Sequence, residues 1–170
     1  MDKFGKLALL IIFTTFLLSA CSPSLKEEQK EIRSAVAASM KKKQSEPNTK
    51  NEVIEFKLPF GFEIDKETPN NIILKNGSKT YILFYNQQEG VLSEVVYKST
   101  LQQKKEYDVK ETFKTKEKFG FLLIEKLSKK ENEMTIGIGG GKITTKAKTT
   151  SLVSEATTMV DIVNSVRVIK

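Results

Sequence analysis

The sequence predicts an α+β fold, in which an antiparallel sheet is covered by an amphipathic C-terminal helix and a mid-chain helix. Three observations lead to this prediction. Short segments with strand composition recur through most of the chain after residue 53. The pair Asn76-Gly77, which is typical of a two-residue hairpin turn, separates two of these segments. The last long segment, 151–166, instead repeats its apolar residues at helical spacing.

The first half of this region is expected to form three or four antiparallel strands. Pro59-Phe60-Gly61 is a turn signal that ends the first strand, and Pro69-Asn70-Asn71 marks a second break. The segments between the turns are rich in β-branched and aromatic residues or alternate between apolar and polar residues. The expected strands are 53–58, 62–64, 72–75 and 80–85.

A helix and further strands are expected in the second half. An approximate helical stripe follows Gly90 and consists of Val91, Leu92, Val95, Val96 and Leu101. Strand composition then returns, with Lys129–Asn132 as a hairpin turn. The expected strands here are 107–113, 119–127, 134–138 and 142–149.

The final segment has the clearest helical pattern. Ser151 is expected to cap its N-terminus, and Glu155 suits the first turn of a helix. Because the apolar residues are three or four positions apart, they share one face. This face consists of Leu152, Ala156, Met159, Val160, Val163 and Val166.

The glycine-rich segment Gly137–Lys142 differs from both kinds of nucleotide-binding loop. A dinucleotide-binding loop needs glycine at the position of Lys142. A P-loop needs glycine at Ile136 and a hydroxyl side chain at Ile143. The segment is therefore interpreted as a flexible hairpin or bulge between two strands.

The N-terminus resembles a bacterial lipoprotein signal. Lys3 and Lys6 precede an apolar run, Leu7–Leu17, that is too short for a spanning helix of about 20 residues. Leu18-Ser19-Ala20-Cys21 then matches a lipobox, in which small residues precede a cysteine. The resemblance implies cleavage before Cys21, a diacylglycerol on its sulfur and a location on the extracytoplasmic face of the cell membrane. An ordinary transmembrane anchor or a secretory signal is the alternative.

The chain is expected to have three regions: a signal peptide (1–20), a lipidated N-terminus with a flexible tether (21–52), and a single globular α+β domain (53–170). The tether is predicted because segment 22–52 has almost no aromatic residues and is rich in charge. A marginal helix is expected within it, from the spacing of Leu25, Ile32, Val36 and Met40. A helical hairpin or docking element is the alternative, which is disfavoured because helices this short are marginal in water.

The composition excludes several kinds of chemistry. Cys21 is the only cysteine and histidine is absent, so the lipidated chain has no thiol for catalysis and no zinc-thiolate site. Neither a catalytic residue nor a metal or cofactor is expected. The full chain carries a charge of +7, and removal of residues 1–20 leaves 26 basic and 20 acidic side chains, or +6. This excess favours anionic lipid headgroups or an anionic wall polymer as partners, whereas no motif points to nucleic acid.

Two sets of lysines form the candidate binding site. If 109–119 is one extended strand, four lysines share a face with Thr112, and three lysines of a later strand share a face with Thr144. Together the two faces would make a patch for anionic headgroups, polymers or a phosphorylated ligand. The alternative is that these lysines only keep a wet sheet face soluble. The candidate residues are Lys110, Lys114, Lys116, Lys118, Lys142, Lys146 and Lys148.

The order of the elements, the segment Phe56–Phe62 with Pro59 and Gly61, and the ending Ile162–Val166 resemble the PsbP-like superfamily. Members of that superfamily combine a phenylalanine-containing early strand and a Pro-Gly-type turn with a C-terminal helix packed on the sheet. The resemblance implies an extracytoplasmic accessory or binding module. It implies no particular functional residues.

Three classes of function remain open. The first is a lipid-anchored extracytoplasmic binding or assembly protein of the cell envelope, with an envelope protein as a further candidate partner. The second is an envelope hydrolase or transferase that uses serine, lysine or carboxylate chemistry. The third is a structural protein of the envelope or of a spore coat. The lipobox and the lack of a catalytic motif favour the first class, which is not an enzyme.

Overall fold

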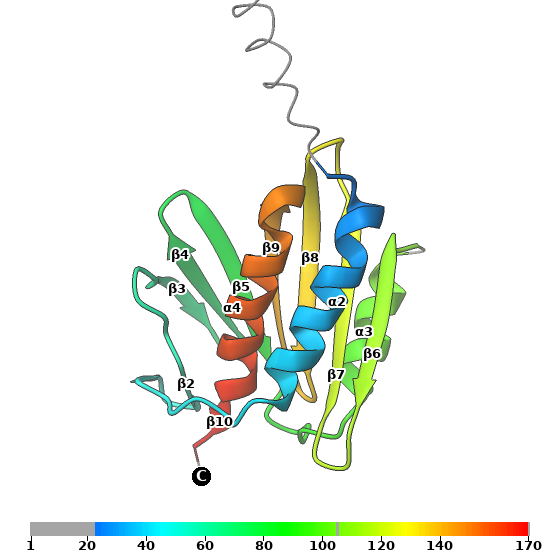
Figure 1. The fold of residues 1–170 in the computed structure, drawn as a ribbon. Coiled ribbons are helices and arrows are strands. Elements are labelled where there is room, and N and C mark those ends of the chain that lie inside the picture. The colour runs from blue at the N-terminus through cyan, green and yellow to red at the C-terminus, as the bar shows by residue number, and fades with distance from the viewer. Residues whose placement is uncertain (1–22, 105, 170) are drawn as a thin grey trace, which may run out of the picture.

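The computed structural model describes residues 23–104 and 106–169 and confirms the α+β class. Its main sheet has seven antiparallel strands in the order β3-β4-β5-β9-β8-β7-β6. Helices α2 and α4 lie side by side on one face, and α3 lies on the other (Figure 1). The elements are α2 (Leu25–Lys41), β1 (Thr49–Lys50), β2 (Ile54–Phe56), β3 (Glu63–Thr68), β4 (Asn71–Asn76), β5 (Lys79–Tyr85), α3 (Val95–Gln103), β6 (Val109–Lys114), β7 (Phe119–Lys126), β8 (Glu131–Ile138), β9 (Gly141–Lys148), the 3-10 turn η1 (Thr149–Ser151), α4 (Leu152–Ser165) and β10 (Arg167–Val168).

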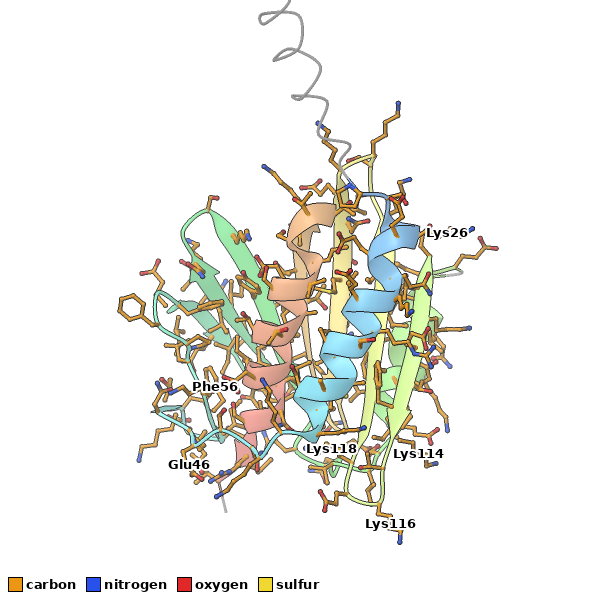
Figure 2. All side chains as sticks on the ribbon, in the orientation of Figure 1. Lys26, Glu46, Phe56, Lys114, Lys116 and Lys118 are labelled. Atoms are coloured by element: carbon orange, nitrogen blue, oxygen red, sulfur yellow. The ribbon has the colours of Figure 1, made fainter. Side chains whose placement is uncertain are left out.

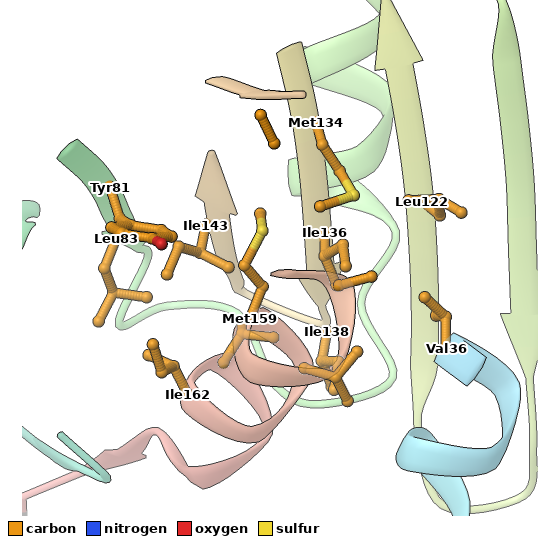
Figure 3. Close-up of a cluster of buried hydrophobic side chains, with 14 of the residues drawn as sticks. Val36, Tyr81, Leu83, Leu122, Met134, Ile136, Ile138, Ile143, Met159 and Ile162 are labelled. Atoms are coloured by element: carbon orange, nitrogen blue, oxygen red, sulfur yellow. The ribbon is translucent and has the colours of Figure 1, made fainter. Parts of the chain in front are cut away.

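The predicted amphipathic C-terminal helix is confirmed as α4. Its apolar face packs on the sheet, and Leu152, Met159 and Ile162 are completely buried. Figure 3 shows Met159 and Ile162 among side chains of the central strands, including Ile136 and Ile143. The apolar periodicity therefore identified most of the buried face, although it omitted Ile162 and included Val166, which follows the end of α4 and is only partly buried.

Strand β7 is buried on both faces. Every residue from Phe119 to Ile124 is buried, because α3 covers the face of Phe121 whereas α2 and α4 cover the face of Leu122. This position between two helix layers explains why the segment is a continuous apolar run and does not alternate.

Helix α2 belongs to the folded domain, although residues 21–52 were expected to be a flexible tether. Ile32 and Val36 are fully buried, and Met40 is nearly so. Figure 3 shows Val36 facing Leu122 of β7, and α2 also packs along α4. An isolated helix of this length would be marginally stable. Here it is stabilised because its apolar side chains are removed from water when they pack on the sheet and on α4. Cys21 and the predicted signal peptide (1–20) lie outside the described residues.

A capping box fixes the start of α2. Glu27 N donates to Ser24 Oγ at 3.4 Å, and Ser24 N donates to Glu27 Oε2 at 2.6 Å. These two bonds satisfy backbone donors that have no partner inside the helix. Hydrogen bonding of the Glu27 carboxylate with the Ser24 backbone N–H, and secondarily with the Ser24 side chain, lowers the pKa of Glu27. Helix α2 therefore has a defined start at Ser24.

A small second sheet, β1-β2-β10, connects the segment after α2 to the end of the chain. Thr49 pairs with Phe56, and Arg167 pairs with Glu55. Ser165 Oγ accepts a hydrogen bond from Lys57 N at 2.7 Å, which ties this sheet to the end of α4. Residues 49–50 are thus also part of the domain.

Candidate functional site

A groove of about 840 Å³ lies at the end of the molecule where both α2 and α4 terminate. Its walls come from five segments that are distant in the sequence: the end of α2, the loop after β5, the β6–β7 turn, the β8–β9 turn, and the end of α4 with β10. We call it the basic groove because of its cationic side chains, which are Lys41, Lys42, Lys43, Lys116, Lys118 and Arg167.

Glycines allow the loops beneath the groove to pack closely. Gly139 has a φ of 53°, and a Cβ atom there would lie 2.4 Å from the Gly90 carbonyl oxygen. At Gly140 a Cβ atom would lie 2.5 Å from the Glu89 carbonyl oxygen. Asn86 N donates to Gly140 O at 2.9 Å and holds the two loops together. The predicted hairpin at this glycine run is confirmed, and it forms part of the groove wall.

The cations outnumber the carboxylates in the groove. Glu89 and Glu117 are the two acidic residues among its lining residues. Within the described part of the chain, neither Lys116 nor any residue of the run Lys41–Lys43 forms an ion pair. The positive charge of these four ammonium groups is therefore not neutralised by neighbouring carboxylates.

Two of the groove cations are held in place. Lys118 Nζ donates to Asn164 Oδ1 at 2.8 Å, and this bond joins the β6–β7 turn to the end of α4. Arg167 lies 3.3 Å from a carboxylate oxygen of Glu46 and 3.9 Å from one of Glu55. The lining of the groove also includes apolar residues, among them Ile138 and Val163.

The β6–β7 turn takes Lys116 and Lys118 off the strand face on which they were expected. Strand β6 ends at Lys114, and Thr115 Oγ1 accepts hydrogen bonds from the backbone N atoms of Glu117 and Lys118. Figure 2 shows Lys116 and Lys118 near the same end of the molecule as Lys114. The shared lysine face required that 109–119 be one extended strand, and this condition is not met because a hydroxyl-stabilised turn interrupts the segment.

The remaining predicted lysines do not form one patch. Strands β8 and β7 lie between β9 and β6, so the two lysine faces are about 14 Å apart at three strand spacings. The intervening surface carries acidic residues: Lys104 Nζ donates to Glu133 Oε1 at 2.6 Å and also pairs with Glu125. An uninterrupted basic face across the sheet is therefore absent in the described residues.

The lysines of β6 and β9 have separate environments. Lys114 Nζ donates to Glu94 Oε1 at 3.2 Å, and hydrogen bonds from Lys114 and Lys98 lower the pKa of that carboxyl. Lys110 is exposed beside Tyr107 in a small hollow. Lys146 and Lys148 are also exposed and line a second, shallow hollow of about 740 Å³ next to β5.

Lys142 is the most enclosed of the seven candidate lysines. Its Nζ donates to Thr100 Oγ1 of α3 at 3.0 Å and lies 5.7 Å from the centre of the Phe84 ring. Burial lowers the pKa of Lys142, and Glu133 partly opposes this shift. These contacts connect α3 to the sheet and give Lys142 a structural role.

The sequence prediction missed four of the six groove cations. Lys41, Lys42 and Lys43 were assigned to the tether, and Arg167 was not considered. A usable signal was present, since the lysine run directly follows the apolar positions Ile32, Val36 and Met40 of a helix. Cations at the C-terminus of a helix interact favourably with the negative end of the helix dipole, and here they also line the groove.

The groove supplies groups suited to binding an anion. Ammonium groups donate charge-assisted hydrogen bonds to phosphate or carboxylate oxygens, and the guanidinium of Arg167 can do so with two donors.

Among the described residues, no three His, Cys, Asp or Glu side chains are grouped closely enough to hold a metal ion. None of the described helices combines the length and apolar character needed to cross a bilayer.

The chain matches no protein-family model, and a search of curated protein sequences found no match. Its function is therefore inferred from the groove and from the N-terminal motif.

Proposed function

We propose that this protein is a lipid-anchored, extracytoplasmic binding protein of the cell envelope and that the basic groove binds its anionic ligand. One observation carries the proposal: six cationic side chains from three separate segments converge on one groove that has two carboxylates. The lipobox at Leu18–Cys21 supports the anchoring, with a diacylglycerol on the Cys21 sulfur. The resemblance to the PsbP-like superfamily remains a prediction and agrees with a binding role.

The expected ligand is an envelope polymer with repeated phosphate or carboxylate groups. The groove is open along one side and its unpaired lysines are exposed, which suits an extended chain better than an enclosed small molecule. Exposed charges act over about 8 Å at physiological ionic strength. Binding should therefore weaken as salt rises, and it should depend on the groove cations more than on the net charge.

A matched pair of variants tests this proposal. The groove variant combines Lys41→Gln, Lys42→Gln and Lys43→Gln, and the control variant combines Lys126→Gln, Lys129→Gln and Lys130→Gln. Both lose three positive charges from exposed positions, but the control positions lie at the opposite end of the sheet. Binding of the detergent-solubilised mature protein to poly(glycerol phosphate) is measured at low salt.

We expect the groove variant to bind at least about tenfold more weakly than the parent, because a lysine near an anionic surface contributes about 1 kcal/mol. The control variant should keep most of the affinity. Equal losses in the two variants would show that binding follows net charge alone, and no loss in either would contradict the role of the groove.

A further inference from the structure

The start of α2 lies very close to the proposed lipidation site. Only Ser22 and Pro23 separate Cys21 from Ser24, whose capping box begins the helix. Leu25 already packs against the main core. Even a fully extended chain covers at most about 10 Å over the three steps from residue 21 to residue 24. The folded domain is thus connected to Cys21 without a long spacer.

We infer that the end of the domain around Ser24 rests on the anionic surface of the bilayer, while the basic groove faces away from it. This inference rests on the proposed lipidation of Cys21. We call this surface the anchor end; it comprises residues 24–28, the β7–β8 turn at 127–130, and η1. Thr149 N donates to Lys130 O at 3.0 Å, and η1 contacts α2, so the three segments form one surface.

The anchor end has the side chains for contact with lipid headgroups but no strong net charge. Lys26, Lys129 and Lys130 are exposed there, and Glu27 and Glu131 are exposed beside them. Lysines near an anionic membrane attract it, and carboxylates oppose this attraction. The short connection to Cys21 therefore determines the orientation, and the lysines add to it.

The basic groove lies at the other end of α2. This helix has 17 residues, so Lys41 is about 25 Å along the helix axis from Leu25. Figure 2 shows Lys26 at one end of the molecule and Lys116 and Lys118 at the other. Because charge interactions are screened within about 8 Å, the headgroups below the anchor end do not reach the groove. The anionic ligand of the groove is consequently a group beyond the membrane surface.

Site-specific fluorescence quenching tests this orientation. The mature chain has no free thiol once Cys21 is lipidated, so Ser128→Cys and Glu117→Cys each give one labelling site. Residue 128 lies at the anchor end, and residue 117 lies at the groove. The lipidated proteins are placed in phosphatidylcholine–phosphatidylglycerol vesicles that contain a nitroxide on the lipid headgroups. We expect several-fold stronger quenching at position 128 than at position 117. Equal quenching, or stronger quenching at position 117, would overturn the orientation.

A spacer variant tests the role of the short connection. Insertion of roughly ten Gly and Ser residues between Ser22 and Pro23 gives the chain a reach of about 15–20 Å. Quenching at position 128 should then fall toward the value at position 117, and unchanged quenching would contradict the inference. Mass spectrometry of the same samples measures lipidation separately. Protein without diacylglycerol on Cys21 would overturn the proposed anchoring, whereas lipidated protein with the wrong quenching order would overturn only the orientation.

Discussion

The two faces of the seven-stranded sheet differ in how they are covered. On one face, α2 and α4 pack over an apolar core that includes Ile32, Leu122 and Met159. On the other face, the short helix α3 covers a cluster of four buried residues, Val96, Phe119, Phe121 and Leu123. Charged groups also lie on this face: Lys142 donates to Thr100 of α3, and Lys104 pairs with Glu125 and Glu133. Most of the apolar surface buried by the helices therefore lies on the first face, and removing side chains there should destabilise the protein most.

The largest effect is expected from Ile32→Ala on α2. Ile32 is fully buried, and a change from isoleucine to alanine in a core typically costs about 2–5 kcal/mol. Ser34→Ala on the exposed side of the same helix is the control and should be nearly neutral. Urea unfolding of both variants measures the difference. If the two midpoints are equal, α2 does not contribute to the core and would be a tether after all.

A smaller effect is expected from Lys142→Met on the other face. Burial lowers the pKa of Lys142, so the unfolded chain binds this proton more tightly than the folded chain does. Protonated Lys142 therefore lowers the free energy of unfolding at pH values below its pKa in the folded protein. This loss disappears as the pH rises toward the pKa of lysine in the unfolded chain, about 10.4. Lys142→Met should remove this alkaline gain in stability and change the neutral-pH midpoint less than Ile32→Ala does.

Thermal unfolding of this variant and the parent across neutral and alkaline pH checks the expectation. A loss at neutral pH as large as that of Ile32→Ala would show that the contacts of Lys142 with Thr100 and Phe84 outweigh the cost of burying its charge.

Features that depend on neighbouring residues could be predicted from the sequence. The predicted hairpin between β4 and β5 is confirmed, with Gly77 at a φ of 58°. Its two-residue turn is Gly77-Ser78, whereas Asn76 ends β4 and pairs with Lys79. Helix α4 runs from Leu152 to Ser165, close to the predicted 151–166. Helix α3 is shorter than its apolar stripe suggested, because Val91 and Leu92 lie in the loop before it and are exposed.

Features that depend on distant segments could not be predicted. The spacing of Ile32 and Val36 indicated a helix, but the surface that buries them comes from strands far along the sequence. The periodicity of the lysines likewise gave no strand order, and two strands separate β6 from β9. The basic groove combines segments near residues 42, 117 and 167, which only the folded chain brings together.

The central claim is that an anionic polymer binds in the basic groove, and residue-resolved NMR of the amide groups tests it most directly. On addition of poly(glycerol phosphate), we predict the largest shift changes at residues 41–44, 115–118 and 139–141, with little change at the anchor end. The Lys41→Gln, Lys42→Gln and Lys43→Gln variant should lose these changes while it keeps the dispersed spectrum of a folded protein. Shift changes confined to residues 126–130, or to the β9 residues around Lys146, would contradict the claim.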